Sequence, residues 1–338
     1  MGSISRRQFG LGVSTAALAA AYGVPGRAQA PLVMKFSHVA ADDTPKGKGA
    51  IKFRELAEKY TGGKVKVETY PNSQLFKDKE EIEALQLGAV QFLAPSTAKF
   101  APLGAKEFEA LDLPFAFKDE AQFQTLIKGE LGQYLLSKLE PRGVKGLAFW
   151  DNGFHMVSAN VPLLKPSDFQ GLKFRISGSK IADLYFRRMG AIPQILAFSE
   201  VYQALQTGVV DGCENTPSNY YTQKFHEVQK HITNGKHGHL QYAVIVNAKI
   251  WAGLPADIRV PLEKAMDEAS VYANSIALEE NSDALKAIIA SGRTTIHNLT
   301  EAQRGEWYKA MAPVWQQAES RVGKEAIDVM RKVTGQTA

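Results

Sequence analysis

The sequence predicts an α/β protein built on parallel β-sheet, and three observations support this fold class. Strand-like and helix-like segments alternate between residues 32 and 93, a similar alternation returns between residues 144 and 207, and a long helical pattern follows residue 254. Because a β-α-β order needs crossover connections, it implies parallel strands with helices on the faces of the sheet. The alternation therefore predicts two such units in one chain.

The first unit opens with an apolar run that predicts a strand. A helical spacing of apolar residues follows and ends at a glycine pair, and a strictly alternating segment then predicts the second strand. A second helical pattern is capped by Gly88 before a third strand begins. The expected elements are strands over 32–37, 64–70 and 90–93 and helices over 47–60 and 79–87.

The second unit and the segment after it are predicted in the same way. Its expected elements are strands over 144–150, 172–176 and 192–198 and helices over 179–189 and 199–207. Residues 255–291 contain no glycine and, after the first residue, only Pro261 as a proline. Their apolar spacing predicts a helix far longer than the usual mean of about 12 residues. Such a helix could brace two lobes.

The composition is that of a globular protein. The chain has 338 residues, of which 45% are hydrophobic and 22% are charged, which leaves room for two domains of about 100 to 200 residues. Disordered, collagen-like and disulfide-stapled proteins are excluded. The formal net charge is +5, but Arg6, Arg7 and Arg27 lie in a segment expected to be removed. The rest is nearly balanced, so a nucleic-acid partner is not expected.

Residues 1–30 are expected to form a cleaved export signal of the twin-arginine type. Arg6-Arg7 precedes an uncharged segment of small residues, and Ala28-Gln29-Ala30 offers a cleavage site. The alternative is an amphipathic helix at the start of a cytosolic protein. No later segment approaches the roughly 18 consecutive apolar residues that a membrane span needs. The mature protein is therefore expected in the periplasm.

Motifs of enzymes and metal sites give little support to catalysis. In His226-Glu227-Val228-Gln229-Lys230-His231 the second histidine comes one residue too late for a zinc-protease motif, which turns it by about 140° on a helix. His237 and His239 lack a third ligand nearby in the sequence and are more typical of polar groups in a strand or loop. The only cysteine, Cys213, is expected to be a small packing residue. No catalytic residue, metal or cofactor is expected. A periplasmic hydrolase that uses Cys213 or His155 stays open as the alternative of another class.

One stretch has the pattern of an anion site. The strand over 172–176 places Lys173, Arg175 and Ser177 on one face, with Arg175 at the carboxyl end, where open α/β sheets bind their ligands. A guanidinium there can grip a carboxylate with two hydrogen bonds. The alternative is a solvated arginine. Asn215, in the turn-rich segment 211–217, offers a donor and an acceptor on a loop, or else serves its own turn.

These segments also carry a resemblance. Residues 168–175, 198–212, 214–215 and 225–230 strongly resemble the solute-binding subunit of tripartite ATP-independent periplasmic (TRAP) transporters, the DctP family. Residues 70–75 and 113–115 are similar as well, so the likeness covers essentially the whole mature chain. It implies a two-lobed periplasmic binding protein fold with hinge strands and a long lobe-spanning helix. Lobe I would comprise 31–152 and about 241–280, and lobe II 153–240 and about 281–338.

The resemblance also implies the roles of individual residues. Arg175 matches the arginine that binds the carboxylate of an organic acid, Asn215 a ligand-contacting asparagine, and Phe198 an aromatic residue that lines the cleft. Many members have arginine where this chain has His155, which puts a second carboxylate clamp in doubt. His155 could donate a hydrogen bond to a hydroxyl or keto oxygen, or be a satisfied loop histidine. Further ligand contacts are expected at Ser96, Trp150, His38 and Tyr220.

The function implied by the resemblance is the capture of a small organic acid by closure of the cleft. A monomeric binding protein would then dock transiently on membrane subunits driven by an ion gradient. His155 favours a monocarboxylate with hydroxyl, keto or ring character, while a four-carbon dicarboxylate or a sugar acid is the alternative. A sensory binding protein that serves a receptor is a third possibility.

Overall fold

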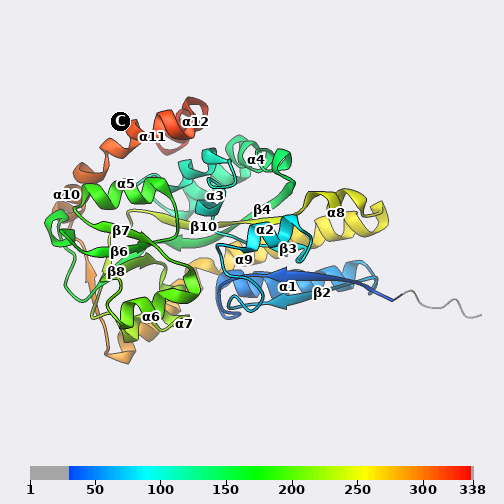
Figure 1. The fold of residues 1–338 in the computed structure, drawn as a ribbon, viewed down its shortest axis with the longest axis horizontal. Helices are drawn as coiled ribbons and strands as arrows, with labels where there is room; N and C mark the ends of the chain where they lie inside the picture. The colour runs from blue at the N-terminus through cyan, green and yellow to red at the C-terminus, as the bar shows by residue number, and fades with distance from the viewer. Residues whose placement is uncertain (1–29, 336–338) are drawn as a thin grey trace, which may run out of the picture. The chain divides into compact units, whose positions relative to one another are not determined.

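The computed structural model describes residues 30–335 of the chain (Figure 1). Apart from Ala30, the expected export signal lies outside the described residues. Among the described helices, none combines the length and apolar character that crossing a membrane requires.

The first sheet has five strands, and only part of it is parallel. Its order is β2 (Val65–Tyr70), β1 (Leu32–Ser37), β3 (Phe92–Leu93), β10 (His239–Asn247) and β4 (Val144–Phe154). β1 pairs in parallel with β2 and β3, as the alternation predicts, whereas β10 runs antiparallel to both β3 and β4. The sequence analysis assigned no strand to β10, and it ended β4 at residue 150, four residues too early.

The second sheet has six strands, and one of them contains a residue that was predicted on a loop. Its order is β11 (Thr295–Asn298), β9 (His231–Asn234), β5 (Met156–Ala159), β8 (Gly212–Asn215), β6 (Lys173–Ile176) and β7 (Ile192–Ile195). Asn215 was predicted on a loop but is the last residue of β8. The glycine that suggested a turn has another role there. A Cβ at Gly212 would lie 2.2 Å from the carbonyl oxygen of Ser158, so only glycine allows the close pairing with β5.

Helices cover the sheets and join them. Those that bear on the site are α1 (Pro45–Tyr60), α2 (Glu81–Gln86), α5 (Lys180–Arg188), α6 (Val201–Gln206), α7 (Pro217–Thr222) and the 3-10 helices η1 (Thr97–Lys99) and η5 (Phe198–Glu200). The others are α3 (Glu120–Lys128), α4 (Glu130–Ser137), α8 (Ala248–Gly253), α10 (Glu301–Met311), α11 (Pro313–Val322) and α12 (Lys324–Thr334).

The long helix α9 (Ala256–Ser291) has 36 residues and agrees with its predicted bounds. It ends at Gly292, whose φ of 66° places it in the left-handed region that favours glycine at a helix C-terminus. Along its length α9 contacts α1 and β4 of the first sheet and then α7 next to the second (Figure 1). The helix therefore braces both parts of the fold.

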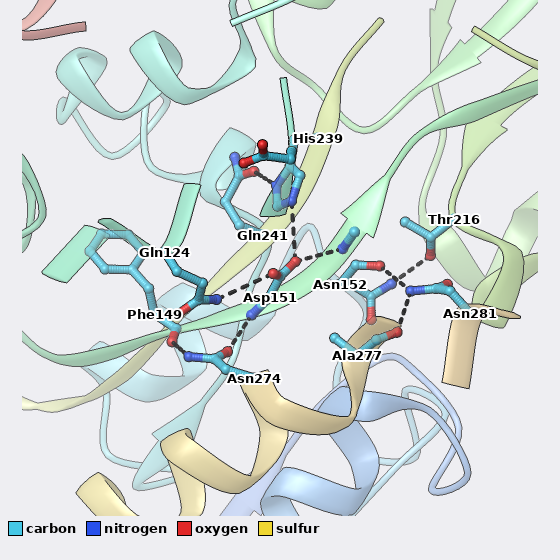
Figure 2. A network of polar contacts seen from close by, with 12 residues as sticks. Gln124, Phe149, Asp151, Asn152, Thr216, His239, Gln241, Asn274, Ala277 and Asn281 are labelled. Carbon is cyan, nitrogen blue, oxygen red and sulfur yellow. Dashed lines mark hydrogen bonds and ion pairs between the residues drawn. The ribbon is translucent and has the colours of Figure 1, made fainter. Parts of the chain in front are cut away.

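Side chains of α9 also hold β4 where the chain leaves the first sheet (Figure 2). Asn274 accepts a hydrogen bond from the backbone nitrogen of Asp151 at 2.7 Å and donates one to the carbonyl oxygen of Phe149 at 3.2 Å. Asn281 donates to the carbonyl oxygen of Asn152 at 2.8 Å. The lobe boundaries expected near residues 152 and 240 fall within β4 and β10, and they stay a prediction.

Candidate binding cavity

A cavity is lined by residues from both sheets. We call it the binding cavity. Five lysine, arginine, aspartate or glutamate side chains line it, namely Lys46, Lys99, Arg175, Asp78 and Glu81.

Arg175 lies at the centre of this charge distribution and is only 4% exposed. Its Nε and Nη2 donate to the carbonyl oxygen of Leu196 at 3.2 and 3.0 Å, and Nη2 is 3.9 Å from Oδ2 of Asp78. Among the described residues, nothing accepts a hydrogen bond from Nη1. The solvated arginine considered as the alternative is therefore wrong. One edge of the guanidinium is anchored, and Nη1 is left for an anion.

Asp78 and Lys99 form a buried ion pair next to Arg175. Lys99 Nζ lies 2.7 Å from Oδ2 of Asp78 and donates to the carbonyl oxygen of Ser177 at 2.6 Å. Burial alone would raise the pKa of Asp78, but the charges of Lys99 and Arg175 outweigh burial and lower that pKa. Asp78 is therefore anionic at neutral pH, and it neutralises Lys99.

Lys46 and Glu81 are the two charged groups of the cavity that have no ionic partner within 4.0 Å among the described residues. Lys46 donates to the carbonyl oxygen of Ala94 at 3.2 Å and lies 3.8 Å from the ring centroid of Tyr242. Neither carboxyl oxygen of Glu81 has a hydrogen-bond partner among the described residues. Burial lowers the pKa of Lys46 to about 8 and raises the pKa of Glu81 to about 7.

Four of the expected contact residues line this cavity, namely Ser96, Arg175, Phe198 and Asn215. The guanidinium carbon of Arg175 is 5.9 Å from the ring centroid of Phe198. Asn215 Oδ1 accepts hydrogen bonds from the Thr216 backbone at 3.0 Å and from Asn219 Nδ2 at 2.7 Å. Because its carbonyl group is occupied in this way, Asn215 can offer its amide nitrogen to a ligand.

His155 lines a neighbouring cavity instead, within a group that we call the Glu214 cluster (His155, Tyr185, Glu214 and His237). Oε2 of Glu214 accepts hydrogen bonds from Tyr185 at 2.7 Å and His237 at 3.1 Å, and His155 Nδ1 lies 3.3 Å from it. Burial alone would raise the pKa of Glu214, but the two histidines outweigh burial and lower it. Glu214 is therefore a buried anion whose Oε2 is contacted by three side chains.

The Glu214 cluster also contains the residue types of a metal site. One ligand atom each of His155, Glu214 and His237 lies within 4.8 Å of the others, a donor set that suits divalent transition metals. Two of these residues supply the further ligands that the sequence analysis did not find beside His237. They come from the β4–β5 connection and from β8, so no local motif could reveal them. In this structure Glu214 already accepts hydrogen bonds from its neighbours.

Three expected contact residues do not line the binding cavity. Trp150 packs in the core of the first sheet and donates to Ser270 Oγ at 2.8 Å. Tyr220 is buried and donates to the carbonyl oxygen of Cys213 at 2.8 Å. His38 is fully buried beside Lys46. Their positions give no support to direct contact with a ligand.

Cys213 is a buried packing residue, as expected. Its sulfur lies 3.5 Å from Ser158 Oγ and 3.7 Å from the hydroxyl of Tyr220, and burial raises the pKa of the thiol. Among the described residues, no histidine forms a hydrogen bond with it. A thiol in this environment is a poor nucleophile, which removes the structural basis for the hydrolase alternative.

The sequence analysis missed several lining residues, including Lys46, Asp78, Glu81, Lys99, Asn219 and Tyr242. Lys46 follows Thr44 and Pro45 at the start of α1 and is buried, which is rare for lysine, but this burial shows only in the structure. Tyr242 belongs to β10, a strand that was not predicted.

Known proteins share both the sequence and the fold of this chain. A family model described as bacterial extracellular solute-binding protein, family 7, matches residues 36–321. The chain is 58% identical over 333 residues to the C4-dicarboxylate-binding periplasmic protein DctP of Rhodobacter capsulatus, covering 98% of this chain and 100% of that protein.

Two solved structures give the same result. A TRAP periplasmic solute binding protein from Shewanella oneidensis with bound succinate aligns with a TM-score of 0.88 at 43% identity, over 90% of this chain and 100% of that one. One from Pseudomonas aeruginosa with bound L-malate aligns with a TM-score of 0.83 at 41% identity, over 85% and 100%.

Proposed function

Because this chain belongs to the bacterial extracellular solute-binding proteins of family 7, the DctP family, we propose that its ligand is a four-carbon dicarboxylate such as succinate or malate. The protein is a periplasmic solute-binding component of a TRAP transporter, it binds small organic acids, and it is not an enzyme. Such proteins work with membrane subunits. That it acts as a monomer and docks transiently on them is part of the proposal.

The observation that carries the choice of a diacid is the presence of two cations in the binding cavity without a close carboxylate. Lys99 is neutralised by Asp78 at 2.7 Å, whereas Arg175 is 3.9 Å from the same carboxylate. Lys46 donates to a carbonyl oxygen and lies over an aromatic ring, and no carboxylate of the described chain comes within 4.0 Å of it. A buried charge without a partner is costly. A ligand with two carboxylates can supply one partner to Arg175 and one to Lys46.

The preference for a monocarboxylate rested on His155, which stands where many relatives have arginine. His155 lines the neighbouring cavity and contacts Glu214, so it bears on the binding cavity only indirectly. The second cation is supplied by Lys46, from a different element. The four-carbon dicarboxylate that the sequence analysis kept as its alternative therefore has the stronger support, and a monocarboxylate becomes an outcome of the test.

Closure of the cleft strengthens the binding of the ligand, and the ligand in turn favours the closed form. In an open cleft the ligand carboxylates are solvated, and closure removes water and strengthens each ion pair. A ligand must prefer the closed form by about 5.5 kcal/mol to change its population from 1:99 to 99:1. Since Arg175 belongs to the second sheet and Lys46 to α1 on the first, a diacid that joins them favours the closed form.

The test compares succinate with its monomethyl ester by isothermal titration calorimetry. The two molecules share a carbon skeleton and differ in one carboxylate, so we expect the ester to bind at least about 100-fold more weakly. Arg175→Ala should abolish tight binding of both. Lys173→Ala, on the same strand but exposed, is the matched control and should leave the affinity unchanged. Equal affinity for the acid and its ester would exclude the diacid, and a normal affinity of Arg175→Ala would exclude the site.

A further inference from the structure

Glu81 is the one carboxyl group of the binding cavity that the described residues leave without a partner. It is 1% exposed, lies at the start of α2, and lines the cavity. Its two oxygens accept no hydrogen bond from any described residue, whereas Asp78 accepts from Phe198 and pairs with Lys99. A buried carboxylate in such a position is unstable unless it gains a proton or a partner.

The charged and titratable groups around Glu81 come from every element packed around the cavity. They are Lys46 of α1, Asp78 before α2, Lys99 of η1, Arg175 of β6, Tyr242 of β10 and His38 after β1. Lys99 is already paired with Asp78. No hydrogen bond or ion pair within 4.0 Å joins Glu81 to Lys46 in the described chain. Lys46 is therefore free to bind a carboxylate of the ligand.

Entry of a dianionic ligand changes this balance. A second carboxylate placed beside Lys46 would face ionised Glu81 across a cavity from which closure removes water. Two carboxylates that share one dry site do not both keep their charge, because repulsion and desolvation favour protonation of one of them. The ligand is held ionised by Arg175 and Lys46, whereas no cation of the described chain lies within 4.0 Å of Glu81, and burial outweighs the more distant charge of Lys46.

We propose that Glu81 takes up one proton from solvent when a dianionic diacid binds, and that its protonated carboxyl group then donates a hydrogen bond to a carboxylate oxygen of the ligand. This inference rests on the proposed function, since it requires a ligand with two negative charges. The balance is simple: the free protein, the dianion and one proton give the complex, and no covalent bond forms or breaks. Protonation of Glu81 thereby removes one negative charge from the cavity when the dianion binds.

The direction of the pH dependence follows from linkage. In the free protein the pKa of Glu81 is about 7, and a neighbouring ligand carboxylate raises that pKa further. Below pH 7 the free protein already carries the proton, so binding takes up little. Above pH 7 the proton must be drawn from solvent, and the affinity for the dianion falls by up to about tenfold per pH unit.

Two measurements on the full mature protein test the inference. Calorimetry with succinate at pH 8, in phosphate and in Tris, gives the number of protons taken up, because the two buffers release protons with different enthalpies. We expect a value approaching one per succinate. Infrared difference spectra with ¹³C-carboxyl succinate separate the ligand bands from those of the protein. We expect the band of a protonated carboxyl group to appear on binding.

The variants assign the proton to its residue. Glu81→Gln should still bind succinate, since its amide can donate the same hydrogen bond, and it should lack the new carboxyl band. Glu83→Gln, exposed on the same helix, is the matched control and should keep the band. Succinate binding without proton uptake, uptake without a carboxyl band, or a band that persists in Glu81→Gln would each overturn the inference while the proposed function stands. Failure of the wild-type protein to bind any diacid would overturn both.

Discussion

The binding cavity and the Glu214 cluster are adjacent and both contain buried charged side chains, yet only in the Glu214 cluster does the protein supply the partners of the charge. Ser96, Ser177 and Leu240 line both cavities. In the Glu214 cluster, one carboxylate accepts hydrogen bonds from Tyr185 and His237 and lies 3.3 Å from His155. In the binding cavity, Lys46 and Glu81 are buried without an ionic partner at hydrogen-bond distance.

This difference indicates that the Glu214 cluster stabilises the fold, whereas the binding cavity recognises the ligand. A buried charge whose partners are all supplied by the protein holds the fold together, and removing one member leaves the others uncompensated. A buried charge without an ionic partner in the protein reduces the stability of the fold, but it can form an ion pair with a ligand. Mutation of a charged residue in the Glu214 cluster is therefore expected to reduce stability, whereas mutation of a charged residue in the binding cavity is expected to reduce affinity for the ligand.

The largest expected effect is on stability, from Glu214→Ala. The substitution removes the acceptor of Tyr185 and His237 and leaves a small cavity between them, so we expect a loss of about 3–5 kcal/mol in the free energy of unfolding. Urea denaturation at pH 7 measures it. Glu306→Ala, exposed on α10, is the control and should change stability by less than about 0.5 kcal/mol. A loss below about 1 kcal/mol would show that the cluster does not contribute to the fold as the contacts indicate.

The comparison also applies to stability at low pH, because one buried histidine lies beside each cavity. Burial and the charge of Lys46 lower the pKa of His38 to about 3 from 6.5, and neither ring nitrogen has a hydrogen-bond partner among the described residues. His237 donates a hydrogen bond to Glu214, and its pKa is also lowered, by burial, with that contact opposing the shift. His38 has no hydrogen-bond partner among the described residues, and the one carboxylate near it, 3.9 Å from Nε2, belongs to the half-exposed Asp42. It should therefore dominate the acid sensitivity of the fold.

The sign of that effect follows from proton counting. As the pH falls below 6.5, the unfolded chain protonates His38 and the folded chain does not, so stability is present above pH 6.5 and is lost as the pH falls. Between pH 6.5 and 4 the loss from this residue is on the order of 3 kcal/mol. We expect His38→Leu to lose that much less stability than wild type over the same range in urea denaturation. Val271→Leu, a position on α9 that is 68% exposed and carries no titratable group, is the control and should follow the wild-type slope. Parallel slopes for wild type and His38→Leu would contradict the assignment.

How far the sequence predicts this molecule differs between the fold and the site. The elements with clear periodicity, such as β1 and α9, agree closely with their predicted bounds, because local pattern and tertiary environment favour the same structure. β8 was missed because Gly212 is required for close approach to Ser158, not for a turn. Arg175 and Asn215 were candidates from their local patterns, and a resemblance implied their roles. Lys46 and Glu81 lie on α1 and α2 and meet only through the packing of those helices on the first sheet, so no local pattern could reveal them.

The smallest expected effect on stability, and the sharpest contrast with Glu214→Ala, comes from Lys46→Met. Methionine keeps the length of the side chain against the Tyr242 ring but removes a buried ammonium whose only hydrogen bond is to the carbonyl oxygen of Ala94. The relief of desolvation offsets the lost contact, so the free energy of unfolding should change by less than about 1 kcal/mol in either direction. The affinity for succinate should fall by at least about tenfold, because one ligand carboxylate loses its cation. Lys59→Met, exposed on the same helix, should alter neither quantity. A loss of several kcal/mol in the free energy of unfolding, with normal affinity for succinate, would show that Lys46 stabilises the fold and does not bind the ligand. The second carboxylate of the ligand would then have no cation, which would favour a monocarboxylate.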